Sequence, residues 1–382
     1  MHQKNDMRIA WLLPVAWFYW QPFLSEFSKE FPNTVIFTAL WPGFAKGFEN
    51  TLDVRPIGKW KVFRKESEGK GYGSGLTYIS PTVVFALFKF WPKLIYTNAF
   101  GIWTLLALLT KPVGQWKVVI AYEGSAPGVD FLNSPRRLMI RKLMASLADG
   151  FITNSQTGRH YLTTHLGAKE NRVFAHPYEV PATKSLFAES YDTPLSVTET
   201  LTRPLFLFVG RVMARKGLKT LLNACVQLKQ REHEQYTLLV VGDGEELDSL
   251  QTYCQTHQID NCVEWTGRVD YAKIGSYFQA ADVFVLPTIE DTWGVVVLEA
   301  MLFGKAVLCS SGAGSSELIS QGENGFVFDP NSVNDLADAM QFMIEHPKKM
   351  KLAGENSRQT MANYTPKSAS QFLVEVTVCV TQ

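Results

Sequence analysis

Residues 282–304 read DVFVLPTIEDTWGVVVLEAMLFG, and this stretch decides the fold that the sequence predicts. The apolar run 283–286 is followed by a proline, a pattern typical of a buried strand that ends at a loop. The β-branched residues 295–297 would suit a second strand. Gly294 and Gly304 instead bracket a segment of Leu, Ala and Met that favours a helix with a C-terminal glycine stop. The sequence therefore predicts a strand, an acidic loop and a helix.

Two carboxylates of this stretch, Asp291 and Glu299, lie eight positions apart. A fully helical span of that length rises roughly 12 Å, which is too long for two carboxylates that share a proton or flank one bond. They could hold the two ends of an elongated ligand, with the backbone N–H groups of Trp293, Gly294 and Val295 facing an anion between them. A sugar nucleotide has that layout. The spacing leaves open an alternative in which Asp291 caps the helix and Glu299 is a solvated surface charge.

The segment PTIEDTWGVVVLEAMLFG resembles the signature of the retaining GT-B glycosyltransferases of the family 4 type, also called group 1. In that signature an acidic residue and a Glu are separated by seven residues. Asp291 occupies the first position, and its neighbour Glu290 is one residue out of register. The resemblance implies that Asp291 meets hydroxyls of the donor sugar and that Glu299 meets the ribose hydroxyls. It also implies that the backbone of Trp293 and Gly294 lies near the transferred sugar.

Length and composition set limits on the function. The chain has 382 residues, enough for two domains, and a formal net charge of +1, which gives no argument for a nucleic-acid partner. The five cysteines lack CxxC spacing, which favours reduced thiols in a cytoplasmic protein and no metal site. These cysteines are Cys225, Cys254, Cys262, Cys309 and Cys379.

The sequence predicts no membrane-spanning segment, because the apolar stretches 83–91 and 102–109 are too short. The abundant aromatic residues of the first half are expected mainly in the core, although they could line an acceptor cleft or touch a membrane. The predicted helix 134–147 has a basic face. Such a face is usually solvated, but it could attract a phosphate-bearing or anionic-lipid acceptor. We expect a cytoplasmic protein, which could be peripheral at the inner face of a membrane. The cations of this face are Arg136, Arg137, Arg141 and Lys142.

The first half begins as a doubly wound α/β sheet, with a strand at 8–14, a helix at 22–31 and a strand at 34–39. The charged, glycine-rich residues 64–75 predict an exposed loop. A further strand at 116–121 ends next to Glu123. Relatives in the family commonly have a His at a comparable strand end near the reacting sugar carbon. This chain has Glu123 near that place instead, so the role of the His is not carried over. Glu123 is a catalytic candidate only by its position at the carboxyl end of a strand, and a loop-capping role is the alternative.

The second half opens with a buried strand at 205–209, the loop GRVMARKG and a helix that begins at residue 218. Arg211 and Lys216 stand at this strand-to-helix junction, where a helix N-terminus already favours an anion. The segment is similar to the diphosphate-binding segment of the same family, which predicts that Arg211 and Lys216 bind phosphate and that Arg215 faces solvent.

Three further segments continue the resemblance. The strand end TGRVD resembles the place where relatives hold the nucleobase through backbone groups, near Arg268 and Val269. Gly312 and Gly314 predict a tight turn beside the donor. The pair Asn324-Gly325 predicts a hairpin-like turn.

The resemblance implies an α/β protein of the GT-B fold, with two Rossmann-like doubly wound domains that face each other across a cleft. We expect residues 1–182 to bind the acceptor, residues 183–203 to form a linker and residues 204–365 to bind the nucleotide sugar. Residues 366–382 are expected to cross back to the first domain.

The expected reaction moves a sugar from a nucleoside-diphosphate sugar to a hydroxyl of a sugar, glycan or lipid-linked acceptor, with retention and without a metal or another cofactor. Arg211, Lys216, Asp291 and Glu123 are the catalytic candidates. A sugar-nucleotide epimerase on the same fold and a non-catalytic sugar-nucleotide-binding protein are alternatives. A nicotinamide-dependent oxidoreductase is disfavoured, because GDGEEL at 242–247 is not a GxGxxG fingerprint.

Overall fold

The computed structural model describes residues 6–58, 60–64, 75–186 and 200–382. The chain divides into two compact units. The first contains the described residues up to Ala182 together with Tyr364–Gln382, and the second contains Thr183–Asn363. The predicted glycine-rich loop at 64–75 and most of the predicted linker at 183–203 lie outside the described residues, apart from a short helix, α8 (Thr183–Leu186).

The first unit is built on a seven-stranded parallel sheet with the order β3-β2-β1-β6-β7-β8-β9. Its central strands are apolar on both sides because helices cover both faces. The strands are β1 (Ile9–Leu12), β2 (Thr34–Thr38), β3 (Asp53–Pro56), β6 (Leu94–Asn98), β7 (Lys117–Ala121), β8 (Gly150–Thr153) and β9 (Val173–Ala175). A separate antiparallel pair consists of β4 (Trp60–Arg64) and β5 (Gly75–Ile79).

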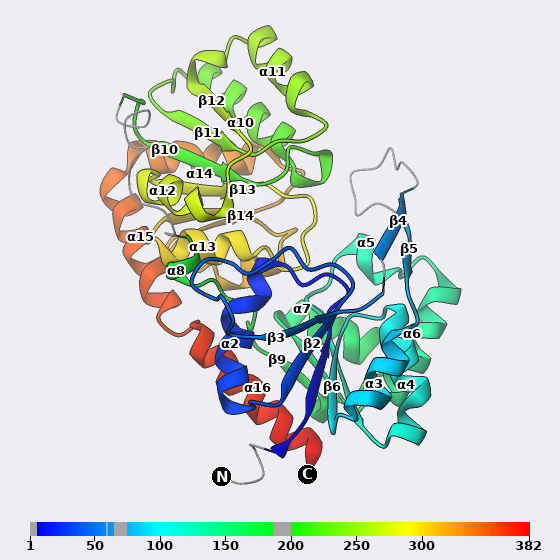
Figure 1. Ribbon diagram of the computed structural model, residues 1–382. Coiled ribbons are helices and arrows are strands. Elements are labelled where there is room, and N and C mark those ends of the chain that lie inside the picture. Colours follow the sequence, from blue (N-terminus) through cyan, green and yellow to red (C-terminus); the bar gives the residue numbers. More distant parts are fainter. Residues whose placement is uncertain (1–5, 59, 65–74, 187–199) are drawn as a thin grey trace. The chain divides into compact units, whose positions relative to one another are not determined.

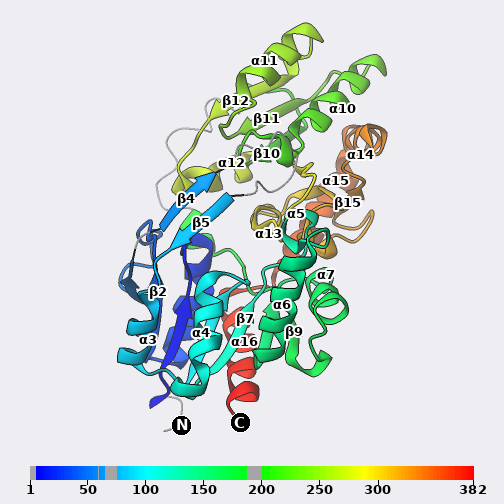
Figure 2. The same ribbon diagram turned by 90° about the vertical axis from the view of Figure 1, so that its right-hand side faces the viewer.

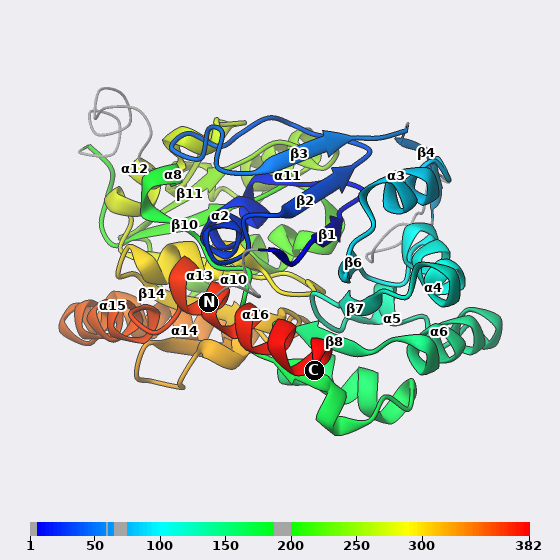
Figure 3. The same cartoon turned by 60° about the horizontal axis from the view of Figure 1, so that its bottom comes forward.

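Two helix layers enclose this sheet. On one face, α3 (Val83–Phe90), α4 (Ile102–Gly114) and α6 (Pro135–Leu147) share a core with the sheet, and they lie side by side in Figures 1 and 3. On the other face, α2 (Gln21–Glu30) packs against α16 (Pro366–Thr381). Shorter helical segments complete the unit: η1 (Phe18–Trp20), α5 (Pro127–Asp130), α7 (Gln156–His160), η2 (Tyr161–His165) and η3 (Glu170–Arg172).

The C-terminal helix α16 is an integral part of the first unit. Leu373 is fully buried, and the Tyr96 hydroxyl of β6 lies 2.8 Å from Oγ1 of Thr377. Tyr96 also stacks on Trp11 of β1, with ring centroids 4.3 Å apart. Thr365 begins the helix with a capping box that involves Ser368. The last segment of the chain therefore covers one face of a sheet that the first hundred residues begin.

The second unit has a six-stranded parallel sheet with the order β12-β11-β10-β13-β14-β15. The strands are β10 (Leu205–Val209), β11 (Thr237–Val241), β12 (Val263–Gly267), β13 (Val283–Leu286), β14 (Ala306–Ser310) and β15 (Gly325–Phe328). The α-helices are α10 (Leu218–Gln230), α11 (Leu247–Thr256), α12 (Ile274–Ala280), α13 (Val295–Leu302), α14 (Val333–Glu345) and α15 (Pro347–Met361). The 3₁₀ turns are η4 (Ala214–Lys216), η5 (Asp260–Cys262), η6 (Tyr271–Lys273) and η7 (Gly314–Leu318).

Helices α10, α11 and α14 share one hydrophobic core with this second sheet, and Figure 2 shows α10 and α11 next to strands β10 to β12. Both units therefore confirm the predicted α/β class with two doubly wound parallel sheets. No helix in the described part of the chain has both the length and the apolar character needed to cross a bilayer.

One prediction about a turn is wrong. Asn324-Gly325 does not join the strands of a hairpin, because β15 runs parallel to its neighbour β14. The glycine is required for another reason: a Cβ at position 325 would lie 1.9 Å from the carbonyl oxygen of Val307. The side chain of Asn324 is buried and accepts a hydrogen bond from the N–H of Ser320.

We expect Leu373→Ala to lower the free energy of unfolding of the first unit by about 2–5 kcal/mol, because it leaves a cavity between α16 and the sheet. Val378→Ala, at a position 37% exposed on the same helix, is the matched control and should cost far less. Urea unfolding followed by tryptophan fluorescence measures both effects. Equal losses for the two variants would contradict the packing described here.

Candidate functional site

The acidic loop after β13 is held against the loop after β14 by backbone hydrogen bonds. The N–H of Asp291 donates to Gly312 O at 2.8 Å, and the N–H of Gly314 donates to Asp291 O at 3.1 Å. A Cβ on Gly312 or Gly314 would lie 2.3 or 2.4 Å from a carbonyl oxygen of the acidic loop. The two glycines are thus needed for the close approach of these loops, and the fold fixes the position of the Asp291 backbone.

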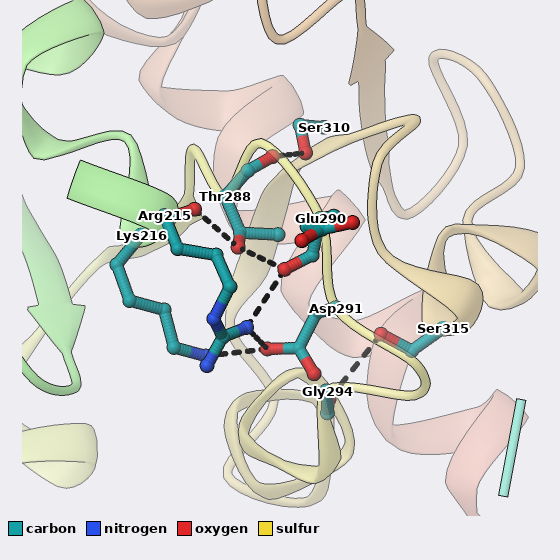
Figure 4. Close-up of polar contacts among 8 residues, drawn as sticks. All are labelled: Arg215, Lys216, Thr288, Glu290, Asp291, Gly294, Ser310 and Ser315. Carbon is teal, nitrogen blue, oxygen red and sulfur yellow. Dashed lines mark hydrogen bonds and ion pairs between the residues drawn. The ribbon is translucent and has the colours of Figure 1, made fainter. Parts of the chain in front are cut away.

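Lys216 and Asp291 form a largely buried ion pair between Nζ and Oδ2, as Figure 4 shows. Their side chains are only 15% and 12% exposed. The pair forms because η4 is pressed against the acidic loop at Gly217, which has a φ of +69°. A Cβ there would lie 1.9 Å from the carbonyl oxygen of Pro287. Two of the predicted site residues, 75 positions apart, are therefore in direct contact.

The prediction for Arg215 is wrong. We expected its side chain to face solvent, but it is only 13% exposed. Its Nη1 donates to Glu290 O at 2.7 Å and lies 3.8 Å from Oδ2 of Asp291 (Figure 4). The buried Asp291 carboxylate and the Glu290 carbonyl both need hydrogen-bond donors or a positive charge nearby, and the Arg215 guanidinium provides them. Asp291 therefore lies next to two cations.

The helix after this loop is α13, as predicted, and it begins at Val295. Gly294 is its N-cap residue, with a φ of +85°, which suits a glycine. Trp293 is only 2% exposed, and its carbonyl accepts a hydrogen bond from the N–H of Ser315 at 2.8 Å. Because Val295 is the first residue of the helix, its N–H has no partner within the helix. This helix terminus presents a partial positive charge beside the Asp291 loop.

Glu299 lies on the buried side of α13. It is 5% exposed, and its Oε1 accepts a hydrogen bond from the Tyr271 hydroxyl at 2.8 Å. Burial raises the pKa of Glu299 to about 7, and the Tyr271 hydrogen bond opposes part of that rise. Burial and the Glu299 carboxylate in turn raise the pKa of Tyr271. The alternative of a capping Asp291 and a solvated Glu299 is thus wrong on both counts, since the N-cap is Gly294 and Glu299 is buried.

A cavity of about 540 Å³ opens at the carboxyl ends of β10 and β11 and beside the loop after β12. This is the edge at which parallel α/β sheets bind ligands. Three predicted site residues line it: Arg211, Arg268 and Val269. The guanidinium of Arg211 is more than half exposed, and its Nη2 lies 3.4 Å from Oε2 of Glu245. This arginine is therefore accessible to a ligand in the cavity.

Sequence reasoning missed several lining residues of this cavity. They are Val209, Gly210, Val241, Gly242, Asp243, Gly244 and Ile274. A signal for them was present, because both β10 and β11 end in a glycine at the same edge of the sheet. The segment 242–247 served only to reject a dinucleotide fingerprint, although its first three residues line the cavity.

Glu123 belongs to the first unit, whereas the other predicted site residues belong to the second. Its Oε1 accepts a hydrogen bond from Nδ2 of Asn98 at 3.1 Å. Its carbonyl accepts one from Nδ2 of Asn154 at 3.0 Å. These bonds join the carboxyl ends of β6, β7 and β8, as the loop-capping alternative requires. A catalytic role for Glu123 stays a prediction.

Among the described residues, no cluster of three or more His, Cys, Asp or Glu side chains could hold a metal ion. All five cysteines are free thiols, and only Cys379 is exposed.

Residues 196–360 match a family model described as Glycosyl transferases group 1. The matched residues belong to the second unit. An uncharacterized glycosyltransferase of Methanocaldococcus jannaschii is 30% identical over 152 residues, which are 40% of this chain and 38% of that protein. The sulfoquinovosyl transferase of Arabidopsis thaliana is 22% identical over 313 residues, or 76% of this chain and 58% of that one. The chain thus spans about half the length of these curated relatives.

Solved structures extend the likeness across both units. The sucrose-phosphate synthase of Thermosynechococcus elongatus superposes with a TM-score of 0.75 at 20% identity, covering 98% of this chain and 99% of the other. HepE of Anabaena in complex with UDP-glucose gives 0.73 at 19% identity, covering 98% and 100%. The chain has the GT-B fold. The second unit accordingly has its acidic loop and its cavity along one edge of its sheet.

The raised pKa of Glu299 predicts a pH dependence of stability. Between about pH 4.5, its ordinary value, and about pH 7, the folded protein holds a proton that the unfolded chain releases. Its contribution to the free energy of unfolding is thus fully present at low pH and is lost as the pH rises to about 7.

Glu299→Gln removes this titration. Between about pH 5 and pH 7, the free energy of unfolding of the wild type should therefore fall by about 1–3 kcal/mol more than that of the variant. Urea unfolding at several pH values measures the difference. Glu264→Gln, which changes an exposed carboxylate of β12, is the control and should keep the wild-type slope. A wild-type slope in Glu299→Gln would rule out the protonated buried carboxyl.

Proposed function

We propose that this chain is a retaining glycosyltransferase that moves a sugar from a nucleoside-diphosphate sugar to an acceptor hydroxyl, in the biosynthesis of a glycan or glycoconjugate. The observation that carries the proposal is the Lys216–Asp291 pair, which joins the loop after β10 to the acidic loop before α13. Five residues before Lys216, on the same loop, Arg211 lines the cavity at the sheet edge. Cations, a carboxylate and a helix N-terminus thus belong to one run of loops.

The order of these groups along the sheet edge fits the order of base, diphosphate and sugar in a sugar nucleotide. The nucleobase would occupy the cavity near Arg268 and Val269, and the diphosphate would lie between Arg211, Lys216 and the N-terminus of α13. Asp291 would accept hydrogen bonds from the sugar, and Glu299 would accept them from the ribose. Solved structures of HepE in complex with UDP and with UDP-glucose support a donor of this class.

The chemistry follows from where charge develops. When the bond from the anomeric carbon to the diphosphate breaks, negative charge grows on the departing oxygens. Fixed cations in a site shielded from water stabilise that charge, and such electrostatic stabilisation usually lowers the activation barrier more than any other single effect. In this proposal Arg211 and Lys216 take that part, so that no metal ion is required. Asp291 holds Lys216 in place before the donor binds and then shares it with the phosphate.

The first unit would bind the acceptor, which is a sugar, a glycan or a lipid-linked molecule. Strand β7 of its sheet ends at Ala121, two residues before Glu123, which is the candidate of this unit for contact with the acceptor hydroxyl. We assign the retention of anomeric configuration from the family resemblance of the acidic loop. Loss of transfer in Glu123→Gln with unchanged donor affinity would support a direct role for that carboxylate.

Lys216→Ala should lower the turnover number by about 10²–10³-fold or more, because it removes a positive charge that stabilises the departing diphosphate. The fold should persist, since Arg215 still lies 3.8 Å from the Asp291 carboxylate. Lys348→Ala removes an exposed cation of α15 and is the control. Thermal melting checks the fold and initial-rate kinetics measure transfer. Near-wild-type turnover by the Lys216 variant would disprove the assignment.

A thermal-shift panel of UDP, GDP and ADP sugars identifies the donor. One donor class should stabilise the protein by about 2.7 kcal/mol at one hundred times its Kd, and the others much less. NMR of the product made from that donor then reports the anomeric configuration. Inversion would contradict retention, conversion of the donor without an acceptor would indicate an epimerase, and binding without turnover would indicate a non-catalytic protein.

A further inference from the structure

The outward face of α4 and α6 exposes large apolar side chains that the fold does not use. On α6, Met139 is 66% and Leu143 is 60% exposed, and Leu147 follows at 40%. On α4, Leu109 is 61% and Val113 is 67% exposed. Isolated exposed leucines are ordinary, but a contiguous group on neighbouring helices marks an interaction surface.

The spacing of these residues places them on one stripe of each helix. Residues 139, 143 and 147 recur every four positions, as do 109 and 113, and such residues lie one above the other on a helix. The helices α4 and α6 pack side by side, as Figures 1 and 3 both show. Nζ of Lys111 on α4 donates to Leu147 O at the end of α6, at 3.0 Å. The two stripes therefore belong to one surface, which we call the α4–α6 face.

Positive charge lies beside this face on α6. Residues 80–149 contain eight Lys and Arg but only three acidic residues, Glu123, Asp130 and Asp149, in a chain whose net charge is +1. Asp149 pairs with Lys111 and Lys117, at 2.7 and 3.4 Å. Asp130 is buried and accepts a hydrogen bond from Ser125, and Glu123 accepts one from Asn98. None of these three carboxylates pairs with Arg136, Arg137 or Lys142 of α6.

The cations of α6 divide into two groups. Arg141 points inward, where Nη1 donates to the Tyr161 hydroxyl at 2.9 Å and the guanidinium lies over the Phe100 ring. Arg136, Arg137 and Lys142 are exposed and form no ion pair with any described residue. The outward side of α6 thus combines an apolar stripe with cations at its borders, while Arg141 and the buried Met144 attach the helix to the sheet.

We propose that the α4–α6 face docks on an anionic lipid bilayer. Apolar side chains that enter the headgroup region, with cations beside them that meet anionic lipids, are the two contacts by which helices bind in the plane of an interface. A second copy of this chain fits poorly, because a twofold contact through this face would bring Arg136, Arg137 and Lys142 close to their own copies. The inference concerns the first unit alone and does not rest on the proposed glycosyl transfer.

Co-sedimentation with vesicles tests the inference. The full chain should bind vesicles of phosphatidylcholine with phosphatidylglycerol more tightly than vesicles of phosphatidylcholine alone, and added salt should weaken the binding. Arg136→Gln/Lys142→Gln should weaken it about 25-fold, at roughly fivefold for each cation. Met139→Ser/Leu143→Ser should weaken it by about tenfold or more, because less apolar surface enters the bilayer.

The second unit offers a matched control. Helix α15 exposes Lys348, Lys351 and Leu352 on its surface. Lys348→Gln/Lys351→Gln and Leu352→Ser should leave vesicle binding unchanged. Thermal melting confirms that every variant is folded. Since the substituted residues are exposed, melting temperatures should stay close to that of the wild type.

Three outcomes would overturn the inference. The first is equal binding by the α6 variants and the wild type. The second is no binding to vesicles of either composition. The third is a concentration-dependent dimer that the α6 substitutions abolish while vesicles are not bound, which would assign the face to a second copy. Because no donor is added in the vesicle assay, its failure leaves the proposed transfer reaction untouched.

Discussion

The buried contact of Asp291 with Lys216 and Arg215 is the constraint on which the candidate site depends. A carboxylate that is 12% exposed has lost most of its water, and the free energy of that loss must be offset by nearby donors. The two cations provide these donors from a 3₁₀ turn 75 positions earlier in the chain. The turn and the acidic loop must therefore be held at a fixed distance. Glycines at 217, 312 and 314 make this possible, because a side chain at any of them would meet a carbonyl oxygen of the loop.

Most strands and helices around this site can be predicted from the sequence, because each depends on residues within its own segment. Short apolar runs that are followed directly by glycine or proline identify β10, β11 and β13. The helix α13 is more instructive, because Val295–Val297 have strand propensity and yet form its first turn. Val297 and Leu298 are fully buried there, so that packing outweighs the preference of single residues. The stop at Gly304 and the run of Leu, Ala and Met were the better guides.

The features that could not be predicted from the sequence depend on contacts between distant segments. Nothing in ARK at 214–216 tells which cation points inward, and the structure brings both toward Asp291. Tyr271 was not found as the partner of Glu299, because the two lie 28 positions apart and only the packing of η6 on α13 joins them. The turn signal Asn324-Gly325 was misread for the same reason. A turn fixes the local direction of the chain, whereas the strand that β15 pairs with is set by the whole sheet.

Both proposals for the first unit involve the elements around β7. The strand ends at Ala121, two residues before Glu123, and the loop that follows leads through Asp130 into α6. Arg141 of α6 contacts the Asp130 carbonyl at 3.3 Å, and the Asp130 side chain accepts hydrogen bonds from Tyr122 and Ser125 on either side of Glu123. A helix bound to a bilayer through its outward face would therefore be attached, through its inward face, to the strand end proposed for the acceptor. An acceptor hydroxyl carried by a lipid would then need to reach that strand end, to which Arg141 links the helix through Asp130.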